Sequence, residues 1–172
     1  DMLAEALHLE DIEVLSPTYE EKFKKLVVYV PESDADVVRE AIGNAGAGAI
    51  GNYSHCTFNS HVVGTFLPNE DANPVIGKIG SLEQVNEVKI ETIIPSTLQR
   101  KVISAMLKAH PYEEVAYDIY PLDNQGMELG LGRVGKVKQE QTIEEFADFV
   151  KKALDVDGVR IVGNLEAKVK KV

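Results

Sequence analysis

The chain has 172 residues, of which 44 % are hydrophobic and 27 % are charged, and its formal net charge at pH 7 is −10. This composition is typical of a globular protein with one large or two small domains. No apolar run is long enough to span a bilayer, and the acidic start has neither the basic region nor the apolar stretch of a signal peptide. We therefore expect a cytoplasmic protein with no membrane partner.

The charge and the cysteine content also limit which partners and which cellular compartment are expected. Residues 1–22 carry seven acidic residues and one lysine, and no segment has the clustered basic residues that neutralise phosphates. Nucleic acid is therefore not an expected partner. The single cysteine, Cys56, excludes an internal disulfide and fits a reducing compartment, where a half-buried strand position is expected for it.

The first 22 residues predict the end of a helix and a connector. Apolar spacing over residues 2–9 indicates the last turns of an amphipathic helix, and an acidic connector containing Pro17 follows. The helical face consists of Met2, Leu3, Ala6 and Leu7. Because the chain opens on Asp1 without an initiator methionine or a cap, we expect it to begin inside a larger protein.

Residues 23–68 predict a strand, a helix and two further strands. A β-rich run covers residues 24–30, and the helix after Pro31 is expected to have Ser33 as its N-cap. Gly43 weakens the interior of this helix, and Gly46 and Gly48 end it. Strands are then predicted at residues 54–60 and 62–68.

Residues 82–122 predict a long strand, a helix and a closing strand. The strand covers residues 82–94, where its mixed alternation allows for a bulge. The helix covers residues 97–109, and Pro111 ends it because proline removes a donor and disfavours helical geometry at the preceding residue. The side chains that this helix should bury are Leu98, Val102, Ile103, Met106 and Leu107. The closing strand covers residues 115–122.

The order β-α-β-β-α-β over residues 23–122 predicts an α+β fold of the ferredoxin-like class, with two helices on one face of an antiparallel sheet. The open face of that sheet needs a partner. The side chains expected to be mostly buried are Leu26, Val28, Val38, Ile42, Ile90, Val102, Met106, Val115 and Ile119.

Residues 123–172 change in character and predict part of a separate α/β layer. A glycine-rich strand is expected at residues 130–138, a helix with a Thr-Ile-Glu-Glu start at residues 142–154, and strands at residues 159–163 and 167–172. The sequence Gly130-Leu-Gly-Arg-Val-Gly135 matches the dinucleotide fingerprint, but no helix can start directly after it. A glycine-rich strand is therefore favoured over a nucleotide loop, although Arg133 could point at a phosphate or carboxylate.

The segment from His110 to Asp118 concentrates titratable side chains where a helix must end. His110 stands at a helix C-terminus, where the helix dipole favours a protonated imidazole and disfavours the nearby carboxylates of Glu113 and Glu114. This corner is either an ordinary helix end with solvated glutamates or a contact for a ligand or subunit. For His55, Cys56 and His61, a metal site is disfavoured, because neighbouring strand residues point to opposite faces and His55 and His61 are about 20 Å apart on an unbroken strand.

The His110-Pro-Tyr-Glu corner occurs together with Gly46-Ala-Gly48, Ile50-Gly-Asn-Tyr53, Cys56-Thr-Phe58 and Gly64-Thr-Phe66. With these motifs the chain resembles YqfO-type members of the NIF-three-like family, the GTP cyclohydrolase I type 2 homologues. Residues 23–122 look like the PII/CutA-like insert domain of those proteins. Residues 1–22 and 123–172 look like the helix end, connector and returning α/β segment of the parent domain. Val63 and Asp71 stand where the insert pattern usually has glycine.

The resemblance implies a trimerising, ligand-sensing insert domain that is not catalytic by itself. The alternative is part of a metal-dependent hydrolase acting on a nucleotide-like substrate. The family implies two divalent metal ions of the zinc, iron or manganese class, but the residues matching its ligands lie outside this chain, so we expect no cofactor or catalytic residue within it. Self-association in multiples of three, as a trimer or hexamer, is expected. The candidates for a ligand or subunit cleft are His110, Tyr112, Glu113, Glu114, Tyr53 and His55.

Overall fold

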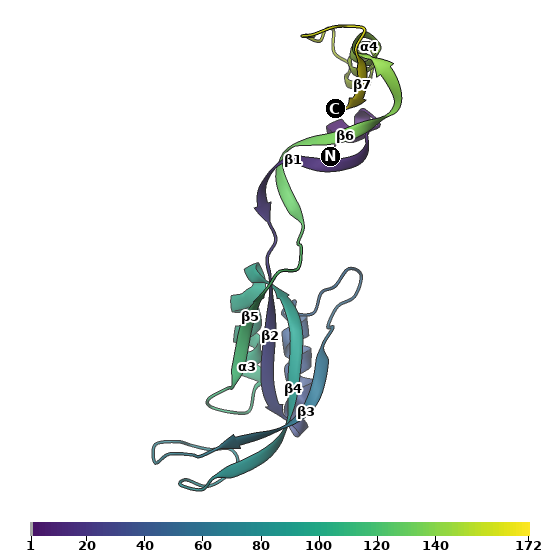
Figure 1. Ribbon diagram of the computed structural model, residues 1–172. Coiled ribbons are helices and arrows are strands. Elements are labelled where there is room, and N and C mark those ends of the chain that lie inside the picture. The colour runs from purple at the N-terminus through teal and green to yellow at the C-terminus, as the bar shows by residue number, and fades with distance from the viewer. Residues whose placement is uncertain (1) are drawn as a thin grey trace. The chain divides into compact units, whose positions relative to one another are not determined.

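The computed structural model of the protein describes residues 2–172 and divides into two compact units (Figure 1). The insert unit is Glu21–Gly126. The flanking unit consists of residues 2–20 together with Met127–Val172. Among the described residues, no helix is both long enough and apolar enough to cross a membrane.

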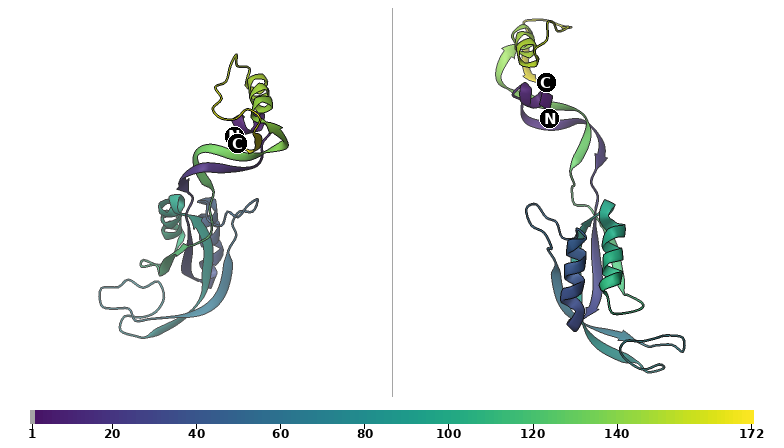
Figure 2. Two further views of the ribbon diagram at one scale, coloured as in Figure 1. Left: turned by 45° about the horizontal axis from the view of Figure 1, so that its top comes forward. Right: turned by 180° about the vertical axis from the view of Figure 1, so that it is seen from behind.

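The insert unit has the predicted ferredoxin-like topology. Its elements in chain order are β2 (Phe23–Pro31), α2 (Ala35–Asn44), β3 (Phe58–Phe66), β4 (Glu83–Pro95), α3 (Gln99–Ala109) and β5 (Tyr117–Leu122). The strands form one antiparallel sheet in the order β3-β4-β2-β5. Both helices cover the same face of this sheet, as Figure 2 shows from behind. The α+β prediction is therefore confirmed.

The core of the insert unit lies between its sheet and its two helices. Leu26 pairs with Thr92 and Ile119 in the sheet, and alternation along β2 and β4 turns every second side chain toward the helices. Of the nine side chains expected in the core, seven are buried, while Val115 and Ile119 are half-buried and pack against the others. The buried seven are Leu26, Val28, Val38, Ile42, Ile90, Val102 and Met106.

Several local predictions in the insert unit were wrong. Residues 54–57 are not strand, so the two strands predicted between residues 54 and 68 are the single strand β3. The pairing of β4 is continuous on both sides and contains no bulge. Ser33 does not cap α2, since its hydroxyl bonds the side chain of Asp34 and a short 3-10 turn (Glu32–Asp34) precedes the helix. Leu107 is 45 % exposed because it lies on the outer side of α3.

The flanking unit contains α1 (Met2–Ala6), β1 (Glu10–Glu20), β6 (Glu128–Thr142), α4 (Ile143–Leu154) and β7 (Lys168–Lys171). Its antiparallel sheet has the order β1-β6-β7. The start of α4 is a capping box, as predicted: the Thr142 hydroxyl accepts from the Glu145 N–H, and the Glu145 carboxylate accepts from the Thr142 N–H.

Three predictions for this unit were wrong. The acidic connector is the strand β1, in which Pro17 lies opposite Gly130. In α1 the buried side chain is Ala4, while Met2 and Leu3 are exposed. Residues 159–163 are not strand. The glycine-rich motif does lie within β6, and Arg133 donates to the Gly130 and Gly132 carbonyl oxygens, so the strand interpretation is confirmed.

Candidate functional site

His110 ends helix α3, as Pro111 requires. Its backbone is extended, with φ −75° and ψ 136°, and its ring is 7 % exposed. The ring Nε2 lies 2.8 Å from the Tyr29 carbonyl oxygen, to which it can only donate. Nδ1 lies 3.1 Å from the backbone N–H of Tyr112, from which it accepts. In this arrangement Nε2 donates and Nδ1 accepts, so both ring nitrogens are bonded within the fold.

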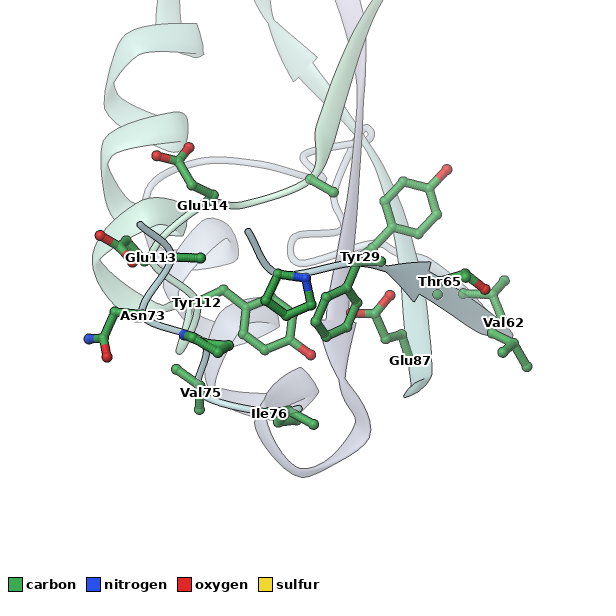
Figure 3. Close-up of a pocket in the computed structure, with 17 residues that line it drawn as sticks. Tyr29, Val62, Thr65, Asn73, Val75, Ile76, Glu87, Tyr112, Glu113 and Glu114 are labelled. Atoms are coloured by element: carbon green, nitrogen blue, oxygen red, sulfur yellow. The ribbon is translucent and has the colours of Figure 1, made fainter. Parts of the chain in front are cut away.

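A cleft of about 440 Å³ lies beside this corner, within the insert unit (Figure 3). Four segments line it: β2 at Tyr29, β4 at Glu87, β3 with the loop that follows it, and the stretch after α3 at residues 112–114 and 116. Of the predicted corner residues, Tyr112, Glu113 and Glu114 line the cleft. His110 does not line it but bonds Tyr29 and Tyr112, which do.

The most buried polar groups of the cleft are the Tyr112 hydroxyl and the Glu87 carboxylate. Glu87 is 9 % exposed. The Tyr112 oxygen is fully buried and makes no hydrogen bond of ordinary geometry with any described residue. Loss of hydration raises the pKa of Tyr112 to about 12, followed by the negative charge of Glu87 and by a side-chain contact with that carboxylate that falls short of ordinary hydrogen-bond geometry. Tyr112 is therefore a neutral hydroxyl at physiological pH and can donate a hydrogen bond.

A glycine on the neighbouring strand makes room for Glu87. A Cβ atom placed on Gly64 would lie 2.3 Å from Glu87 Oε2, closer than any real contact. Gly64 and Glu87 lie on adjacent strands of the sheet, and both line the cleft. The glycine of the Gly-Thr-Phe motif thus lets the carboxylate lie against the strand instead of turning into water.

The remaining walls are mainly apolar and the rim is acidic. Glu113 and Glu114 are exposed, and Figure 3 shows their carboxylates pointing away from the Tyr112 ring. Of the two departures from the insert pattern, Val63 lines the cleft, whereas Asp71 does not but precedes the lining residue Ala72 in the loop. The apolar side chains of the wall are Val62, Val63, Phe66, Pro68, Ala72, Pro74, Val75, Ile76 and Ala116.

The other two candidates do not line this cleft. Tyr53 is 75 % exposed and forms an isolated bridge with Ile50. The His55 ring lies over Gly43, where a Cβ would be 2.0 Å from its Cδ2 atom, and its Nε2 lies 3.2 Å from Asn44 Oδ1. Gly43 is therefore a packing site for His55, not merely a weak point of α2.

The metal implied by the resemblance does not fit the residues present. Within residues 2–172, no group of three or more His, Cys, Asp or Glu side chains is placed to hold a metal ion. The exposed His61 lies 3.8 Å from Glu32, and His55 lies apart from it. No chemical step of this chain is therefore assigned to a metal.

Sequence reasoning missed Glu87, Tyr29 and the apolar loop residues. Glu87 belongs to no motif, and its role depends on the pairing of β4 with β3, which places it beside Gly64. A carboxylate diagonal to a glycine on the same face of two paired strands was the available signal, but it required the strand register in advance.

The protein is therefore of a two-unit class, in which an insert unit of ferredoxin-like topology carries a cleft and is joined to an α/β flanking unit. The family profile Duf34/NIF3 (NGG1p interacting factor 3) matches residues 1–172, so the chain belongs to this family.

Relatives and solved structures agree with that assignment. A GTP cyclohydrolase 1 type 2 homolog of Halalkalibacterium halodurans is 59 % identical over 172 residues, which are 100 % of this chain and 46 % of the relative. A Bacillus cereus protein related to NIF3 has 60 % identity and a TM-score of 0.85 over 99 % of this chain and 45 % of that one. A weaker likeness, at 14 % identity and a TM-score of 0.45, is to CutA of Archaeoglobus fulgidus, over 77 % of this chain and 98 % of that one. The chain thus spans about half the length of the curated relatives it matches.

Proposed function

We propose that the insert unit is a ligand-sensing and self-associating module, which binds a small molecule in the cleft and assembles in multiples of three. The observation that carries the ligand part is the buried, unpartnered Tyr112 hydroxyl beside the buried Glu87 carboxylate, in a cleft of about 440 Å³. Buried polar groups are normally paired, so a hydroxyl left without a partner calls for an explanation. A bound molecule would provide that partner. The volume is also in the range of small-molecule sites.

Self-association is supported by the sheet face that the helices leave open. Phe58 pairs with Glu91, and alternation places both on that face, where Phe58 is 73 % exposed. Lys89 lies on the same face, 3.1 Å from Glu91, whose hydrogen bond raises the pKa of the lysine. Tyr120 is 52 % exposed there. Strands β3 and β5 are also the two edges of the sheet within the insert unit, and free edges are usually covered in stable proteins.

Analytical ultracentrifugation and native mass spectrometry of the 172-residue chain test the assembly. We expect a mass that is a multiple of three chains. Phe58→Lys should lower the assembled fraction, because it places a charge on the open face. Val63→Lys is the matched control, since Val63 is 62 % exposed on the same strand but on the opposite face. A monomer at every concentration would contradict this proposal.

A metal-dependent hydrolase is the second candidate, because the curated relatives are named GTP cyclohydrolase 1 type 2 homologs. The chain spans 46 % of their length. We propose that this activity, if the whole protein has it, requires residues outside the chain. Incubation of the purified chain with GTP and zinc or manganese should give no turnover. Tight stoichiometric metal binding, or turnover that a substitution within the chain abolishes, would contradict this.

A further inference from the structure

We propose that the cleft selects an uncharged or cationic planar group that presents N–H donors to Glu87, and that it rejects anionic ligands, including those that carry phosphate. This inference rests on the proposed binding of a small molecule in the cleft. It adds the chemical class of that molecule, which is argued from the charge, the hydrogen-bonding groups and the shape of the lining.

The charge of the lining is uniformly negative. Among the residues that line the cleft, three are glutamates, namely Glu87, Glu113 and Glu114, and none is a lysine, arginine or histidine. Phosphate and carboxylate sites use arginine, lysine or helix N-termini to balance the anion. A phosphate placed here would instead meet carboxylates, one of which is largely withdrawn from water, so its charge would be opposed and not balanced.

The buried polar pair defines the hydrogen bonds available to the ligand. The Glu87 carboxylate can only accept, so the matching ligand group is a donor, and an N–H gains most because the acceptor is charged. The Tyr112 hydroxyl keeps its proton at neutral pH, as shown above, and can donate to a carbonyl oxygen or ring nitrogen of the ligand. A primary amide meets both groups at once. An amidinium meets Glu87 with a full opposite charge.

The apolar walls favour a flat body behind that polar edge. Pro74, Val75 and Ile76 come from the loop and line the cleft together with Tyr112, and Figure 3 shows Val75 and Ile76 near the Tyr112 ring. Aromatic rings bury large apolar areas with little loss of conformational entropy, so a planar ring suits a slot between such side chains. A flexible aliphatic polyamine would satisfy the charge of the cleft but not its walls.

Three probes of nearly the same size and shape test this class: benzamidine, benzamide and benzoate, which are cationic, neutral and anionic. Their dissociation constants for the 172-residue chain are measured by NMR titration of amide signals. We expect benzamidine to bind most tightly, benzamide less tightly and benzoate not detectably. Shifts should concentrate in residues 62–66, 72–76 and 112–114, which line the cleft.

Substitutions identify the residues responsible. Glu87→Gln keeps the shape and removes the charge, so benzamidine should bind about ten-fold more weakly, the equivalent of one charge-assisted hydrogen bond, while benzamide, which carries no charge and keeps a neutral acceptor, should lose less affinity. Glu40→Gln is the control, since Glu40 is an exposed residue of α2 that does not line the cleft. Tyr112→Phe should weaken benzamide binding, and it keeps the test decisive if Glu87→Gln does not fold by circular dichroism.

The outcomes separate this inference from the proposed function. Benzoate or inorganic triphosphate binding as tightly as benzamidine would overturn the charge selection, as would unchanged benzamidine binding in folded Glu87→Gln. If no probe binds, the inference falls, while assembly in threes can still hold. A monomer that binds the probes in the expected order would remove the assembly proposal and leave this inference standing.

Discussion

The insert unit has a hydrophobic core of its own, whereas most apolar side chains of the flanking unit remain accessible to solvent. In the insert unit, nine large side chains are less than 2 % exposed, and they lie between a four-stranded sheet and two helices. In the described part of the flanking unit, only Ala4 and Ala147 are buried apolar residues, while Leu131 is 72 % exposed. The relatives are about twice as long as the chain. In the flanking unit, strand pairing and a helix cap therefore form without a closed core.

The largest expected effect tests whether the two units differ in core closure. Met106 is fully buried between the sheet and α2, so Met106→Ala should lower the free energy of unfolding of the insert unit by about 2–5 kcal/mol. Leu131→Ala, at an exposed site, should change stability by no more than about 0.5 kcal/mol. Urea unfolding followed through amide signals of each unit measures both changes. Equal effects would remove the contrast.

A smaller effect tests how much the flanking unit depends on local signals. Thr142→Ala removes the capping hydroxyl of α4 and should destabilise that unit by about 1 kcal/mol. Ser33→Ala is the control in the insert unit, because the Ser33 hydroxyl caps no helix. Thermal unfolding followed by circular dichroism measures both. A larger loss for Ser33→Ala than for Thr142→Ala would show that the assigned caps are wrong.

The smallest effect concerns the unpartnered hydroxyl of the cleft. Tyr112→Phe should raise the stability of the insert unit by up to about 1 kcal/mol, because no hydrogen bond is lost and a buried polar group is removed. Tyr120→Phe, at an exposed site, should have no effect. A clear loss of stability in Tyr112→Phe would reveal a hydrogen bond to Glu87 in solution.

Tyr112 also makes the stability of the insert unit depend on pH. The pKa of Tyr112 is raised from 10.0 to about 12, first by burial and then by Glu87. Because the folded pKa exceeds the unfolded one, Tyr112 leaves the stability of the insert unit constant below about pH 10 and lowers it as the pH rises through about 12. Ultraviolet absorbance titration should show one of the six tyrosines ionising late, and this late step should be absent in Tyr112→Phe.

The sequence predicted the insert fold well because its two periodicities are clear. Val102 and Met106 repeat at helical spacing, Leu26 and Val28 alternate, and Pro111 marks a helix end that the structure confirms. Strand β1 was missed for the opposite reason. It is almost entirely exposed and contains Pro17, so its strand structure comes from pairing with β6 and not from a buried face.

The candidate site was predicted only in part. The corner after α3 was found because proline, tyrosine and glutamates stand together, and three of its residues do line the cleft. The hydrogen bonds of His110 were not predicted, because the acceptor role of Nδ1 depends on how residue 112 folds back. Glu87 required the three-dimensional register of β3 and β4.

The pairing of β4 has a mechanical consequence. Residues of β4 that pair with strands on both sides begin at Glu87, which lies opposite Pro31 in β2 and Val62 in β3. Beyond it, residues 83–86 pair with β3 alone, and a two-stranded ribbon without a third strand resists bending less than a full sheet. The ribbon can therefore bend more easily than the rest of the sheet, and Glu87, at the residue where the third strand ends, also lines the cleft.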